Sequence, residues 1–68
     1  RQLKKDLSRL ERQIEKLKVR IIELDLKQSS AAFDSEKLVL VGQELDQCKS
    51  QLVAREEEWL QVTLSLES

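Results

Sequence analysis

The chain has 68 residues, of which 37% are charged and 3% aromatic, with one glycine, no proline and a formal net charge of −1. A chain this short rarely stabilises a fold with its own core, and its composition departs from globular usage toward that of long helices and coiled coils. These values argue against a compact globular domain. They also argue against a membrane span, because the longest apolar run is only Leu38 to Val41.

Apolar residues recur at every seventh position along the whole chain. We call this series the d column, and its ten members are Leu3, Leu10, Leu17, Leu24, Ala31, Leu38, Leu45, Leu52, Trp59 and Leu66. Between them lies the a column, which consists of Leu7, Ile14, Ile21, Gln28, Ser35, Gly42, Lys49, Glu56 and Thr63. The alternating three- and four-residue steps are typical of a coiled-coil seam, and ten matches at 40% apolar content would arise by chance about once in ten thousand.

We therefore predict an all-α fold, in which a single long continuous helix forms a coiled coil. A parallel dimer is preferred, and an antiparallel or tetrameric helical bundle is the alternative. Residues 1–27 are a regular heptad zipper, because both columns are apolar there, with Ile14 and Ile21 at a and leucine at d. This filling favours parallel two-stranded packing.

Residues 28–37 are predicted to be a register transition with weak packing. The step from the first seam to that of the second half takes two three-residue intervals after Gln28, and the side chains that follow it are small. Ser29 and Ser30 could cap a new helix and so begin a helical hairpin. No glycine or proline supports a tight reversal, so the continuous helix is preferred over the hairpin.

Residues 38–68 form the second half, where the a positions are polar or glycine. The seam there is shifted and broader, and it is interrupted by Arg55; it comprises Leu38, Val41, Leu45, Cys48, Leu52, Trp59, Val62 and Leu66. The e positions Val39, Val53 and Leu60 flank the d column on its other side. The predicted oligomer interface is Leu3, Leu7, Leu10, Ile14, Leu17, Ile21, Leu24, Ala31, Leu38, Val41, Leu45, Leu52, Trp59, Val62 and Leu66.

A further apolar series lies on the outer face of the predicted dimer, at positions f and b. We call it the second partner surface, and it comprises Val19, Ile22, Leu26, Phe33 and Leu40. A row of this size at helical spacing indicates that another helix covers it, by tetramer formation or by binding a different chain. Neighbouring sequence of a longer protein is an equally good candidate.

Charge is distributed unevenly along the chain. Up to Arg20 there are 8 basic and 3 acidic residues, or +5, whereas Ser35 to Ser68 has 3 basic and 7 acidic residues, or −4. This polarity favours antiparallel or staggered pairing. Exposed charge pairs contribute only about 0.5 kcal/mol each. Our preference for the parallel dimer therefore rests on the apolar residues at the a and d positions of residues 1–27.

The sequence lacks the residues that catalysis needs. It has no histidine and no glycine-rich phosphate loop, and Cys48 has no base beside it, so we predict no enzyme activity and no cofactor. The carboxylates of Glu56, Glu57 and Glu58 point in different directions on a helix, so we predict no metal site. We interpret Cys48 as a small buried residue, with an interchain disulfide as the alternative, and a lone cysteine favours an intracellular location.

The basic start, Arg1 to Arg20, lacks the asparagine and paired small residues of the DNA-contacting region in basic leucine-zipper proteins. Its seam positions are already apolar, where a DNA-gripping helix would splay apart. We predict no sequence-specific nucleic-acid binding, and weak attraction to polyanions or acidic lipid stays open.

The leucine-rich d column with Lys, Glu and Gln between its members resembles segments of long coiled-coil scaffold proteins, such as centrosomal and cytoskeletal organisers, golgin-type tethers and motor-cargo adaptors. The resemblance implies an intracellular structural protein that spaces or recruits other components, and we expect it in the cytoplasm, with cytoskeletal or centrosomal association as a possibility. The chain starts without methionine and has no signal-peptide pattern, so we expect a segment of a longer protein. The predicted function is self-association of that scaffold; the alternative is a binding helix whose second partner surface captures another helical protein.

Overall fold

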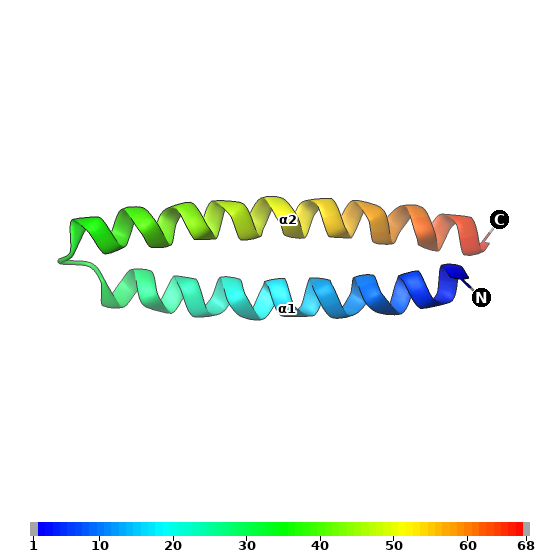
Figure 1. The fold of residues 1–68 in the computed structure, drawn as a ribbon, viewed down its shortest axis with the longest axis horizontal. Helices are drawn as coiled ribbons and strands as arrows, with labels where there is room; N and C mark the ends of the chain where they lie inside the picture. The colour runs from blue at the N-terminus through cyan, green and yellow to red at the C-terminus, as the bar shows by residue number, and fades with distance from the viewer. Residues whose placement is uncertain (1, 68) are drawn as a thin grey trace.

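The fold is a pair of antiparallel helices. The computed structural model describes residues 2–67, with the backbone but not the side chain of Gln2, as two α-helices, α1 (Gln2–Ser30) and α2 (Ser35–Glu67). The helices lie side by side along their length, with the turn at one end, and the start of α1 and the end of α2 at the other (Figure 1). The molecule measures 52 × 14 × 13 Å. The prediction of an all-α fold is confirmed for the described residues.

The prediction of a single continuous helix is wrong, because the chain reverses direction at residues 31–34. Asp34 explains where α2 begins. Its Oδ1 accepts a hydrogen bond from the backbone N–H of Lys37 at 3.2 Å, and its carbonyl accepts one from Leu38 at 2.9 Å. This is the bonding of a helix N-cap, and the carboxylate of Glu36 in the first turn adds a favourable charge beside the positive end of the helix dipole.

The turn needs no residue with special backbone freedom. The N–H of Ala31 still bonds to the carbonyl of Lys27, and the N–H of Asp34 bonds to the carbonyl of Ala31, both at 2.9 Å. Within residues 2–67 no backbone φ is positive. The expectation that a reversal requires glycine or proline therefore failed. Ser30, considered as a cap, instead lies in α1 and donates to the carbonyl of Leu26 at 3.1 Å.

The core of the hairpin is narrow and entirely apolar. Among the described residues, the buried side chains are Leu10, Leu24, Ala31 and Leu45, and no polar or charged residue is buried. All four belong to the d column, so the sevenfold repeat marks the line along which the two helices meet. Ala31 extends this line into the turn, where its small side chain allows the chain to reverse close to the partner helix.

Gly42 is the one glycine of the chain and lies in the interior of α2. A Cβ placed on it would meet no side chain of a residue beyond its immediate neighbours, and no atom of α1, within 4 Å. Because glycine costs a helix about 0.5–1 kcal/mol relative to alanine, we expect Gly42→Ala to raise the free energy of unfolding by about that amount. Urea denaturation followed by circular dichroism measures this, with the exposed neighbour Gln43→Ala as a control of near-zero effect. A loss of stability in Gly42→Ala would contradict the open space around this position.

Candidate helix-pairing interface

The contact between α1 and α2 gathers most of the residues predicted to form an oligomer interface. Leu3 and Leu66, near the open end of the hairpin, are exposed. The remaining thirteen are buried or half-buried in the hairpin: Leu7, Leu10, Ile14, Leu17, Ile21, Leu24, Ala31, Leu38, Val41, Leu45, Leu52, Trp59 and Val62. The apolar seam of each helix is thus already packed against the other helix of the same chain. Its use between chains stays a prediction.

In α2 the interface follows the shifted seam. Val41, Arg55 and Val62 are half-buried, whereas the a-column residues Lys49 and Glu56 are exposed. The guanidinium of Arg55 forms an ion pair with Glu58 on the same helix, at 3.2 Å. Cys48 is a free, half-buried thiol in the same seam.

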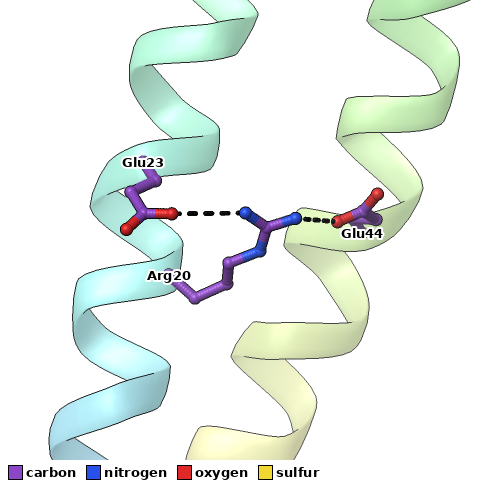
Figure 2. A network of polar contacts seen from close by, with 3 residues as sticks. All are labelled: Arg20, Glu23 and Glu44. Atoms are coloured by element: carbon purple, nitrogen blue, oxygen red, sulfur yellow. Dashed lines mark hydrogen bonds and ion pairs between the residues drawn. The ribbon is translucent and has the colours of Figure 1, made fainter.

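Arg20 links the two helices. One of its terminal nitrogens bonds to Oε2 of Glu44 on α2 at 2.8 Å, and the other to Oε2 of Glu23 on α1 at 3.2 Å (Figure 2). The hydrogen bond to Glu44, followed by that to Glu23, raises the pKa of Arg20 above its ordinary value. The ion pair between Arg20 and Glu44 is partly solvated. We therefore interpret it as fixing the register of the two helices, so that Arg20 faces Glu44.

The direction of the helices agrees with their charges. Over its residues α1 carries 8 basic and 5 acidic side chains, or +3, and α2 carries 3 basic and 7 acidic, or −4. The hairpin brings a basic helix against an acidic one, with the basic start of the chain beside its acidic end. The sequence polarity that favoured antiparallel pairing is therefore satisfied inside the chain, without any second copy.

The five residues of the second partner surface are all exposed. Val19, Ile22 and Leu26 lie on α1, Leu40 lies on α2, and Phe33 lies in the turn with its side chain 104% exposed. They occupy the half of the hairpin nearest the turn. A further exposed set on α2 comprises Val39, Val53, Leu60 and Leu64. The sequence analysis placed the first three beside the d column but did not predict that they are exposed. Val39, Val53 and Leu60 occupy apolar e positions, which the shifted seam leaves facing outward, and Leu64 occupies a b position.

Comparison of the chain with protein-family models, curated proteins and solved structures finds no match. Over residues 2–67, neither helix has a stretch long and apolar enough to cross a bilayer. In the same residues, no three His, Cys, Asp or Glu side chains gather where they could hold a metal ion. The function is therefore inferred from the geometry of the hairpin.

Proposed function

We propose that the chain is a non-enzymatic self-association module, which joins copies of a longer protein by helix packing. The burial pattern supports this. Only four side chains are buried among the described residues, whereas eleven large apolar side chains are exposed. Burying one such side chain contributes about 1.5–3 kcal/mol, so further helices that cover these side chains would add to the stability of the hairpin.

The stability of a self-associating helix pair depends on its concentration. We expect the melting temperature to rise as the chain is concentrated, because mass action favours the associated, folded form. Circular dichroism melts over a hundredfold range of concentration, with light scattering for the mass, measure this. A mass that stays at 7.9 kDa, together with a melting temperature independent of concentration, would contradict self-association.

A second candidate function is the capture of another helical protein. The observation that favours it is the second partner surface, because two exposed apolar residues on α1, Ile22 and Leu26, are followed by the fully exposed Phe33 at the turn. A partner helix with an apolar stripe would bury these side chains without opening the contact between α1 and α2.

Charge placed on the second partner surface tests whether this surface joins copies of the chain. We expect Phe33→Glu combined with Leu40→Glu to leave the fold intact, because both side chains are exposed, and to reduce the mass by scattering only if this surface joins copies of the chain. The control is Gln43→Glu with Ser50→Glu, which adds the same charge at exposed polar positions. Unchanged mass in both variants would assign the surface to a different protein or leave it without a role.

The place of such a module in the cell is part of the proposal. Self-association by heptads, an unpaired thiol at Cys48 and the resemblance to long scaffold proteins support a cytoplasmic structural role. There the chain would space or recruit components, with cytoskeletal or centrosomal association as one form of it. Its partners would be its own copies or another helical protein, without sequence-specific contact to nucleic acid.

A further inference from the structure

The repeat of the sequence continues through the turn. Leu24, Ala31 and Leu38 are each seven residues apart, and Ala31 is buried although it lies in the turn. A hairpin does not require a continuous repeat, because its turn can place the second helix at any rotation about its own axis. The sevenfold repeat of α2 would then be in phase with that of α1 by chance about one time in seven. A straight helix does require it. The d column is therefore suited to a straightened chain as well as to the hairpin.

The turn itself is close to helical. It contains no glycine or proline, and the N–H of Ala31 keeps its α-helical bond to the carbonyl of Lys27 at 2.9 Å. Two alanines, the best helix formers, stand at 31 and 32. The cap made by Asp34 for Lys37 is what favours a new helix start at this point. Straightening the turn removes that cap and continues the backbone hydrogen bonds from α1 into α2.

The register of the hairpin suits a dimer of straightened chains. Arg20 faces Glu44, and the residue midway between them in the sequence is residue 32, in the turn. Two straight chains that lie antiparallel about a twofold axis at residue 32 bring Arg20 of one copy against Glu44 of the other. The apolar contacts between α1 and α2 are remade in the same way.

From these observations we infer that the partner in self-association is a second copy that exchanges α2. The turn straightens, and α1 of each copy packs antiparallel against α2 of the other. This inference rests on the proposed self-association. Exchange of an element is a low-cost route to a dimer, because the contacts between chains are those already made within one. The product is a rod about 100 Å long at 1.5 Å per residue, against 52 Å for the hairpin.

The experiment measures a distance within one chain while the mass is followed. Donor and acceptor dyes are attached to Ser8→Cys and Glu57→Cys in a Cys48→Ala background, and the labelled chain is mixed with a tenfold excess of unlabelled Cys48→Ala chain. In the hairpin the labels are close, because residues 6–10 lie beside residues 54–62. In a straight rod they are about 74 Å apart. We expect energy transfer to fall as light scattering shows the mass doubling.

Variants of the turn sharpen this test. We expect Asp34→Ala to lower the concentration at which both signals change by roughly thirtyfold, since each dimer replaces two hairpins that would otherwise keep a cap. Asp46→Ala, the same change at an exposed position inside α2, is the control and should leave that concentration unchanged. Ser35→Pro favours a helix start at the turn and should keep energy transfer high.

Three outcomes would overturn the inference. A doubled mass with unchanged energy transfer would mean that intact hairpins associate, so that exchange is refuted and the proposed self-association stands. An equal shift in Asp34→Ala and Asp46→Ala would show that the turn does not control the dimer. A mass of one chain at every concentration, in the Cys48→Ala chain and in Asp34→Ala, would refute both the exchange and the proposed function.

Discussion

Leu24→Ala is expected to lower the free energy of unfolding by about 2–3 kcal/mol. Leu24 is 1% exposed and lies in the seam between α1 and α2, so the substitution removes apolar burial and leaves a cavity. The expected value lies toward the lower part of the range for buried leucines, because a two-helix core can partly collapse around the gap. Urea denaturation followed by circular dichroism, at one fixed chain concentration, measures the change.

The matched control stands two residues away. Leu26 is 65% exposed on the same helix, so Leu26→Ala makes the same chemical change where little burial is lost. We expect it to alter the free energy of unfolding by no more than about 0.5 kcal/mol. Equal effects of the two substitutions would mean that α1 does not turn its d column toward α2.

Two proline substitutions have the largest expected difference in effect. Ser50 lies in the middle of α2, and proline there removes a backbone hydrogen bond and clashes with the preceding turn of the helix. We expect Ser50→Pro to cost about 3 kcal/mol or more, enough to unfold much of the chain at room temperature. Helix content by circular dichroism and the midpoint of urea denaturation record the loss.

Ser35→Pro is the partner of that test. Ser35 is the first helical residue after the cap Asp34, a position where proline is favoured because its N–H would have no partner within the helix. In dilute solution, where the chain is a single hairpin, we expect its helix content and urea midpoint to stay close to those of the unchanged chain. If Ser35→Pro were as damaging as Ser50→Pro, residues 31–34 would belong to an uninterrupted helix and not to a turn.

The sequence identified most of the side chains that lie in the contact between α1 and α2. The d column contains Leu10, Leu24, Ala31 and Leu45, all of them buried, because a sevenfold apolar repeat places one residue every two turns on the same face of a helix. The change of seam in the second half also has a physical signal. A charged side chain such as Lys49 is costly to bury, so the neighbouring apolar positions lie at the contact in its place.

The reversal of the chain was not predicted, because its signal in the sequence is a helix N-cap and not a helix-breaking glycine or proline. The absence of glycine and proline at residues 31–34 favoured one helix, whereas Asp34 with Glu36 behind it is an N-terminal pattern that was already readable in the sequence. The heptad count could not help, since a seam is satisfied equally by the same chain or by a copy. The polarity of charge did favour antiparallel pairing, but pairs such as Arg20 with Glu44 are too exposed to have outweighed the a and d pattern.

The start of α1 and the end of α2 lie side by side (Figure 1). This placement determines how the hairpin is oriented relative to any polypeptide attached to it. Polypeptide joined to either end would arrive and depart at one point, so the hairpin adds no length along such a chain and projects from it as a side arm. The arm holds Phe33 at its tip, at the far end of the 52 Å long axis. An apolar group held at that distance can be reached by a neighbour without disturbing the base of the arm.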